Sequence, residues 1–209
     1  MFSPRFLVVS LGNPAPYADT LHSAGHLALV AAQKQLQGTQ PPFSSSRYAK
    51  KSAQASVGPK YTFLQSPAVM NVSGLWVARA YREILADSDV GSADMGLILV
   101  HDDLEEDLGV VKIRKWERSH RGHNGVKSVN ASLRRADYQG SLWARISVGI
   151  GRPADRDQRS VSDYVLRPMS QHQKMVLAEK AGPGVVAALM ELESQWQKDT
   201  VQAAAKESA

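Results

Sequence analysis

The sequence predicts a single α/β domain over residues 1–209, in which helices flank a largely parallel or mixed β-sheet. Short apolar runs alternate along the chain with longer segments whose apolar residues recur at helical spacing. No internal repeat and no linker-like stretch divides the chain. A length of 209 residues with 43% hydrophobic residues is sufficient for one substantial core.

The N-terminal part is expected to form a buried strand, a helix, a hairpin and a second helix. The run RFLVVSL stops at Gly-Asn-Pro, as a buried strand that leads into a turn does. We expect helices over residues 23–37 and 71–87, with Asn71 as the N-cap of the second, and a loop over 38–46. Residues 48–58 and 60–66 flank a Gly-Pro turn and predict a hairpin, whose polar first strand suits a sheet edge.

The C-terminal part is expected to add three strands and three helices. Residues 96–103, 110–114 and 142–151 are apolar or alternating, which predicts strands. Residues 124–135 predict a helix that starts at Asn124 and has Arg134 and Arg135 in its last turn. Helices over 169–182 and 184–196 are expected to hinge at the Gly-Pro-Gly of residues 182–184, before a tail that frays from about 198 to 209.

Positive charge is concentrated in one short part of the chain. The formal net charge is +5, and the segment VVKIRKWERSHR, residues 110–121, carries five basic residues against Glu117 alone, a local charge of +4. Such a concentration is typical of a surface that binds a polyanion such as a nucleic acid. A solvated strand edge would give the same pattern, so charge alone leaves both interpretations open.

Several classes of protein are excluded or made improbable by what the sequence lacks. It contains no Cys, so disulfides, thiolate zinc sites and a cysteine nucleophile are excluded. It has neither a phosphate-binding glycine loop nor the Gly-x-Ser-x-Gly turn of a serine hydrolase. No apolar run is long enough to cross a bilayer, and the first strand begins too early for a signal peptide. We therefore expect no membrane partner and a cytoplasmic location, with an organelle such as the mitochondrion as the alternative.

Polar residues gather where predicted strands end. Asn13 and His22 follow the first strand, and His101, Asp102 and Asp103 end a later one. Sites in open α/β sheets lie beyond the carboxyl ends of the strands, so these residues are expected to converge on one crevice. A histidine held by an aspartate is the usual arrangement for a general base that takes a proton from water. Hydrolysis by direct attack of water is the simplest chemistry for such a set.

Each of these residues also has an ordinary structural explanation. Asn71 and Asn124 lie where helices are expected to begin, and N-capping would account for either one. His22 alone could be a structural histidine. The histidines and aspartates, including His123, could also bind a divalent metal. Spacing by itself therefore favours hydrolysis only slightly.

The order of the motifs provides a more specific indication. The patterns LGNP…Y…T.H..G, MN.SG, HDDL and GHNG.KS, completed by ISVGIGRP and YVL, run from Phe6 to Leu166. In order and approximate spacing they resemble the bacterial-type peptidyl-tRNA hydrolases. The resemblance implies a single α/β domain around a twisted mixed sheet. It also implies hydrolysis of the ester that joins a peptide to the 3′ end of tRNA, by a monomeric enzyme that uses no metal and no cofactor.

The resemblance also implies a role for particular residues. Its general base falls on His22, its orienting aspartate on Asp102, and a catalytic asparagine on Asn13. Five further positions correspond to residues that hold or line the substrate: Tyr17, Met70, Asn71, His123 and Asn124. The residues that contact tRNA phosphates in the family fall on or near Lys112, Arg114 and Arg145.

The chain departs from the family pattern at four places. Ser23 stands where the family usually has an asparagine directly after the catalytic histidine. The glycine-rich approach to GHNG is replaced by the bulkier and more charged KWERSHR, which includes Arg121 and has one extra residue. The turn after HDDL is EEDLG, and the loop that begins at Gly-Asn-Pro is one residue shorter than usual. None of these changes removes an inferred catalytic residue.

Two other functions remain open at this level. One is a non-catalytic RNA-binding protein on the same fold, as in the plastid intron-splicing factors that resemble this family. The other is a metal-dependent peptidase or amidohydrolase that uses the histidines and aspartates as ligands. Turnover of the substrate would exclude the RNA-binding protein. Activity that survives excess chelator would exclude the metal-dependent enzyme.

Overall fold

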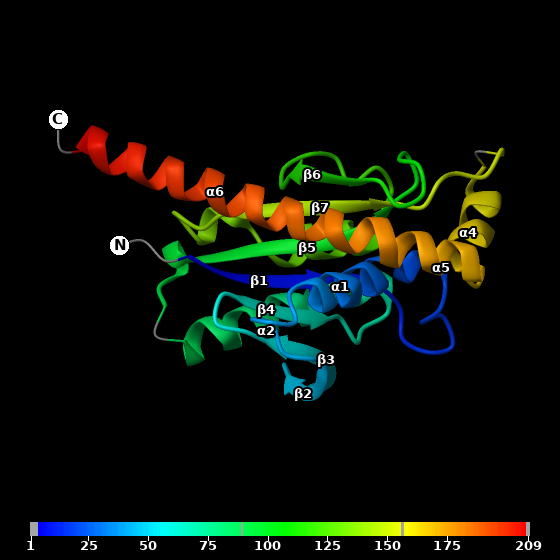
Figure 1. Ribbon diagram of the computed structural model, residues 1–209, viewed down its shortest axis with the longest axis horizontal. Coiled ribbons are helices and arrows are strands. Elements are labelled where there is room, and N and C mark those ends of the chain that lie inside the picture. The colour runs from blue at the N-terminus through cyan, green and yellow to red at the C-terminus, as the bar shows by residue number, and fades with distance from the viewer. Residues whose placement is uncertain (1–3, 89, 156, 208–209) are drawn as a thin grey trace.

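The computed structural model describes residues 4–88, 90–155 and 157–207. Its centre is a seven-stranded sheet with the order β2-β3-β4-β1-β5-β7-β6 (Figure 1). The strands β4, β1, β5 and β7 are parallel to one another, whereas β2, β3 and β6 pair antiparallel to their neighbours. The mixed sheet of the predicted α/β fold is therefore confirmed. The strands are β1 (Arg5–Ser10), β2 (Ser44–Tyr48), β3 (Lys51–Val57), β4 (Tyr61–Gln65), β5 (Met95–Asp103), β6 (Val111–Lys115) and β7 (Trp143–Gly149).

Helices cover both faces of the sheet. α1 and α6 lie together over one face, and α2 packs with α3 over the other (Figure 1). The described helices are α1 (Ala24–Gln35), α2 (Ser73–Asp87), α3 (Asn124–Ser132), α4 (Gln158–Leu166), α5 (Gln171–Val176) and α6 (Gly182–Glu207). None of them is long and apolar enough to cross a bilayer, within the residues that the structure describes.

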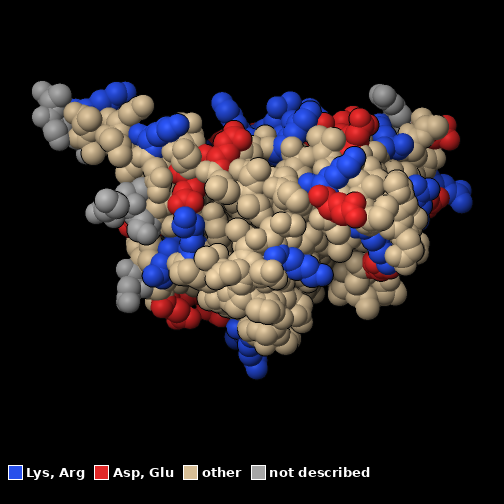
Figure 2. All heavy atoms as spheres, viewed as in Figure 1, with Lys and Arg blue, Asp and Glu red and all other residues tan. Residues whose placement is uncertain are grey.

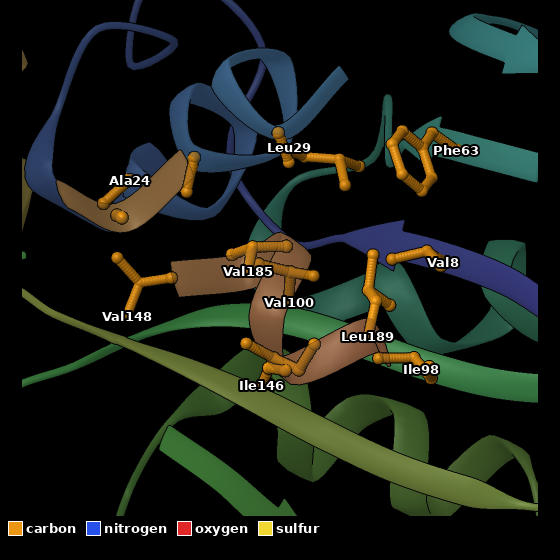
Figure 3. Packing of buried hydrophobic residues seen from close by; sticks show 14 of the residues in the cluster. Val8, Ala24, Leu29, Phe63, Ile98, Val100, Ile146, Val148, Val185 and Leu189 are labelled. Carbon is orange, nitrogen blue, oxygen red and sulfur yellow. The ribbon is translucent and has the colours of Figure 1, made fainter. Parts of the chain in front are cut away.

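The central strands are continuously apolar because both of their faces are buried. Val8 of β1 and Ile98 of β5 point toward α1 and α6, where they meet Leu189 (Figure 3). Leu7 and Leu97, one position away on the same strands, belong to the cluster beneath α2 and α3. Alternate side chains thus fill two hydrophobic cores.

The sheet extends one strand further than expected. Residues 38–46 were predicted to be a loop, yet β2 begins at Ser44 and forms the outer edge, so the polar strand β3 is internal. The run SSSRY lacks an alternating apolar pattern, and contacts with α2 hold the end of this strand and the turn that follows it. The Trp76 indole donates to the Tyr48 carbonyl at 3.0 Å, and the Ala49 N–H donates to Glu83 at 2.9 Å. Tertiary contacts of this kind leave no local signal in the sequence.

The structure differs from the predictions for the C-terminal half at four points. α3 ends at Ser132 because Leu133 is extended, so Arg134 and Arg135 lie beyond the helix. Helix α4 was missed. The Gly-Pro-Gly at 182–184 is not a break, since residues 177–181 form a π-helical turn that continues into α6. Residues 198–207 of the tail expected to fray continue α6 up to Glu207, and residues 208 and 209 lie outside the described residues.

The strands that matter for function end at the same side of the molecule. β1, β5 and β7 are parallel, and their carboxyl ends point toward the loop after β1 and toward α4 (Figure 1). His22 lies in a short 3-10 turn, Leu21–Ser23, between that loop and α1. Backbone bonds from the Leu21 N–H to the Arg167 carbonyl and from the Met169 N–H to the Asp19 carbonyl tie this turn to the segment after α4. The fold therefore holds His22 from two sides.

Candidate active site

A cavity of about 760 Å³ lies beyond the carboxyl ends of these strands. Every residue that the sequence analysis assigned to the site lines it, with the single exception of Lys112. These residues come from the loop after β1, the turn before α2, the end of β5, β6, β7 and the start of α3. The convergence expected from the strand ends is thus present in the structure.

His22 is held by Asp102 at the floor of this cavity. Its Nδ1 lies 2.9 Å from Oδ1 and 3.0 Å from Oδ2 of the carboxylate, which accepts the ring N–H. Burial by itself would lower the pKa of His22, but the charge of Asp102 and this hydrogen bond raise the pKa above its ordinary value of 6.5. The neutral ring therefore keeps a lone pair on Nε2, where it can accept a proton.

Asp102 accepts a second imidazole N–H, from His123. The backbone N–H of Val126 donates to Nδ1 of His123 at 3.3 Å, because His123 is the N-cap of α3. This bond places the ring proton on Nε2, which donates to Asp102 at 2.9 Å. Burial would raise the pKa of Asp102, but the two histidines hold it well below its usual range. The carboxylate is thus charged, and its position is fixed from both sides.

His101 makes no hydrogen bond to the Asp102 carboxylate that binds His22 and His123. It is buried, and its Nδ1–H donates to the backbone carbonyl of Asp102 at 2.7 Å. Burial and the neighbouring His123 ring lower the pKa of His101 to about 3. The residue is therefore neutral over the physiological range and supports the end of β5.

Asn13 presents one end of its amide to the cavity. Its Oδ1 accepts the backbone N–H of Met70 at 2.9 Å, which leaves the amide N–H groups of Asn13 as the donors. Met70 can lie this close because residue 125 is glycine: a Cβ there would come within 2.3 Å of the Met70 sulfur. The second glycine of the GHNG motif thus serves the packing of the cavity wall.

Ser23 links the two ends of the loop after β1. Its buried Oγ accepts the backbone N–H of Asn13 at 3.0 Å and donates to the Tyr17 carbonyl at 3.1 Å. The departure from the family's asparagine at this position therefore leaves a polar side chain that holds the loop beside His22. The contacts of Ser23 with the Asn13 N–H and the Tyr17 carbonyl could not be read from the sequence.

We predict that Ser23→Ala lowers kcat about tenfold and changes KM little. The buried Asn13 N–H would lose its hydrogen-bond acceptor, which lowers the free energy of unfolding by about 1–3 kcal/mol. The loop after β1 would then no longer be held in its position beside His22. Steady-state kinetics of Ser23→Ala and Ser23→Thr would test this, since threonine keeps the hydroxyl. Ser56→Ala removes another buried hydroxyl far from the cavity and is the control for lost stability. Equal kcat in Ser23→Ala and Ser56→Ala would contradict the role given to Ser23.

Asn71 and Asn124 are not helix caps. α2 begins at Ser73 after the 3-10 turn Met70–Val72 and has no side-chain cap, and α3 is capped by His123. Both asparagine side chains are exposed and line the cavity. The capping explanation is therefore removed, and both amides face the space that a ligand would fill. Tyr17, half-exposed at 49%, lies on the same wall.

The three predicted phosphate-binding residues are occupied by contacts within the protein. Lys112 pairs with Glu106 at 2.7 Å, and Arg114 pairs with Asp103 and with Glu106. Arg145 is only 2% exposed, and its guanidinium donates to backbone carbonyls. Burial, then Arg114 and Arg118, lower the pKa of Arg145. In the structure the Arg145 side chain braces the loop after β6 and lines the cavity with little exposed surface, and its predicted contact with tRNA phosphates stays a prediction.

The same geometry would suit a metal ion. One ligand atom each from His22, Asp102 and His123 lie within 4.8 Å of one another, as nitrogen and oxygen ligands of a divalent ion would. In this arrangement, however, both imidazole N–H groups already point at the carboxylate. A metal at these atoms would have to displace both protons, so chelation is a necessary control in any assay.

Taken together, the fold and the site define a class of protein: single-domain α/β proteins in which a buried His–Asp pair at the carboxyl ends of the strands is suited to accept a proton from water. Comparison with known proteins agrees. The model of the family described as peptidyl-tRNA hydrolase matches residues 7–209. The chain is 40% identical over 162 residues to a peptidyl-tRNA hydrolase of Anaeromyxobacter sp. (strain K), which covers 77% of this chain and 76% of the relative. It is 33% identical over 193 residues to that of Delftia acidovorans, covering 88% and 86%.

Solved structures support the same fold. The peptidyl-tRNA hydrolase of Acinetobacter baumannii superposes with a TM-score of 0.62 at 22% identity, covering 97% of this chain and 94% of the other. The chain belongs to the peptidyl-tRNA hydrolase family.

Proposed function

We propose that this chain hydrolyses the ester bond between the peptide and the 3′ end of tRNA in peptidyl-tRNA, with His22 as general base. The observation that supports it most directly is the His22–Asp102 hydrogen bond. It leaves Nε2 of His22 without a partner among the described residues, and His22 lines a cavity that three asparagines also line. Membership of the family adds the substrate.

The geometry suggests the course of the reaction. Nε2 of His22 takes a proton from water, and the water oxygen bonds to the ester carbonyl carbon to give a tetrahedral intermediate. The charge of Asp102 stabilises the imidazolium that forms. When the intermediate collapses, the bond to the ribose oxygen breaks, and that oxygen takes the proton from His22. The products are tRNA with a free hydroxyl and a peptide carboxylic acid, which ionises.

The roles proposed for the three asparagines follow from the positions of their side-chain amides in the cavity. The amide N–H groups of Asn13, together with Asn71, hold the peptide end and its carbonyl oxygen, and Asn124 orients water or the intermediate. Met70 and Tyr17 line the path of the peptide, and His123 keeps Asp102 in position beside the product end. Phosphate contacts would position the tRNA without reading its sequence.

We also propose that the protein acts as a monomer in the cytoplasm. All the residues assigned to the site come from one chain, and the relatives named above are bacterial. No cofactor is required by the proposed chemistry.

The experiment that tests the function is release of free tRNA from an N-blocked aminoacyl-tRNA, measured with and without excess EDTA. We expect multiple turnovers at the same rate in both conditions, because the base and its orienting group are protein side chains. Loss of activity in EDTA, restored by a divalent metal, would favour the metal-dependent hydrolase. Tight tRNA binding without cleavage by the folded protein would favour an RNA-binding protein.

A further inference from the structure

Two arginines beside the cavity are available for a ligand, although the family pattern did not assign them. Arg118 and Arg121 are exposed, line the cavity, and make no ion pair with any other residue that the structure describes. This distinguishes them from Lys112 and Arg114, which are neutralised by acidic neighbours. Figure 2 shows Lys and Arg side chains gathered along the edge of the molecule near β6, with acidic side chains beside them.

The loop that carries these arginines, residues 116–122, is held by internal hydrogen bonds. The buried guanidinium of Arg145 donates to the carbonyls of Lys115 and Arg118, and the Arg118 N–H closes a turn onto the Lys115 carbonyl at 3.2 Å. These bonds set where the Arg118 backbone lies. A charged side chain on a braced backbone loses less entropy on binding than one on a free loop.

Arg121 is held in a comparable way. Its N–H donates to Oγ of Ser119 at 3.2 Å, and the N–H of Gly122 donates to Nδ1 of His120 at 3.1 Å. Arg121 has φ +46° and Gly122 has φ +83°, both in the left-handed region. The tight turn leads directly into His123, the residue that bonds Asp102. The loop is thus connected rigidly to the centre of the site.

The electrostatics of this region favour an anion. Burial, then Arg114 and Arg118, lower the pKa of Arg145, while Asp103 and Glu117 act in the opposite direction. An anion bound at the exposed guanidinium of Arg118 would reduce the repulsion between Arg118 and Arg145. Guanidinium groups bind phosphate oxygens through paired, charge-assisted hydrogen bonds.

We propose that Arg118 and Arg121 bind the phosphodiester groups of the single-stranded 3′ end of the tRNA as it enters the cavity. They lie in the segment KWERSHR, which replaces the family's glycine-rich approach to GHNG. This inference rests on the proposed function, because it takes tRNA as the ligand. Arg118, Arg121 and their loop are not among the phosphate-binding residues that the family resemblance implies.

The test compares Arg118→Ala/Arg121→Ala with Lys34→Ala/Arg79→Ala, which removes the same charge from two exposed residues outside the cavity. Each protein is assayed with N-blocked aminoacyl-tRNA and with a minimal substrate, the same N-blocked aminoacyl group esterified to adenosine, which has no phosphate. We expect kcat/KM for the tRNA substrate to fall about 10- to 100-fold in the cavity variant only. The minimal substrate should be cleaved equally by both variants.

Binding of deacylated tRNA at several salt concentrations supplies an independent measurement. Each lost phosphate contact reduces the slope of log K against log salt by about 0.7–0.9, so the cavity variant should lose about 1.5 from the wild-type slope. An unchanged slope, or an equal loss in the control variant, would overturn the assignment. Equal loss with the minimal substrate would also overturn it, since the arginines would then serve the chemistry.

The same data separate this inference from the proposed function. If the wild type cleaves neither substrate but its tRNA binding depends on Arg118 and Arg121 as expected, the hydrolase assignment fails and the phosphate contacts stand. If the wild type cleaves both substrates and the arginines make no difference, the reverse holds. Thermal unfolding of each variant verifies the fold.

Discussion

Replacement of His22 with alanine is expected to lower kcat by about 10²–10⁴-fold, the usual contribution of general base catalysis. The reason is geometric: Nε2 of His22 has the lone pair that the Asp102 hydrogen bond leaves free in the cavity. KM for peptidyl-tRNA should change little, because the phosphates and the peptide are held by other residues. Cleavage of N-blocked aminoacyl-tRNA under single-turnover conditions is the direct measurement.

The matched control is His172→Ala, which removes an exposed histidine from α5. This variant should have wild-type kcat. The His22 variant must also retain its fold, tested by thermal unfolding, and its affinity for tRNA. Wild-type turnover by a folded His22→Ala protein would exclude His22 as the base, and the search would then move to the other side chains of the cavity.

The parts of the fold that could be predicted are those with a local cause. Val8 and Leu7, or Ile98 and Leu97, are apolar at neighbouring positions, and a strand buried on both faces needs that pattern. The edge strand β2 has no such pattern, and hydrogen bonds to α2 from its last residue and from the turn after it help to hold it in place. Its absence from the prediction follows from that difference.

The site shows the same division. That Asn13, His22 and Asp102 would meet followed from strand ends in an α/β sheet and from the motif order. That His123 would donate to Asp102 could not be inferred, because it depends on the Val126 N–H fixing the tautomer of a residue 21 positions away from the carboxylate. A histidine directly before a helix is a weak signal for an N-cap at best.

The basic residues show why charge in a sequence differs from charge on a surface. Lys112, Arg114 and Arg145 lie in the basic strands, yet acidic side chains or backbone carbonyls occupy all three. The number of basic residues can be counted in the sequence, but which of them are buried or paired with acidic residues depends on the fold. Arg118 and Arg121, both exposed in the loop after β6, have no acidic partner among the residues described.

The second large effect is expected for Asp102→Asn. The His123 N–H donates to Oδ1, so it would keep the amide oxygen at that position and place the amide nitrogen where Oδ2 lies, 3.0 Å from Nδ1 of His22. An amide N–H there favours the tautomer with its proton on Nε2, which cannot accept a proton from water. We expect kcat to fall by about 10²–10⁴-fold at the pH optimum, as for loss of the base itself.

The pH profile separates this explanation from general damage. In the wild type the charge of Asp102 raises the pKa of His22, so kcat/KM should be lost as pH falls through a value above 6.5. In Asp102→Asn burial remains and the charge is gone, so the acid limb should move to lower pH while the plateau drops. Asp107→Asn, which changes an exposed carboxylate on the loop after β5, should keep the wild-type profile. If the maximal kcat/KM drops but the pH at which activity is lost on acidification stays the same, Asp102 supports the fold and does not set the pKa of His22.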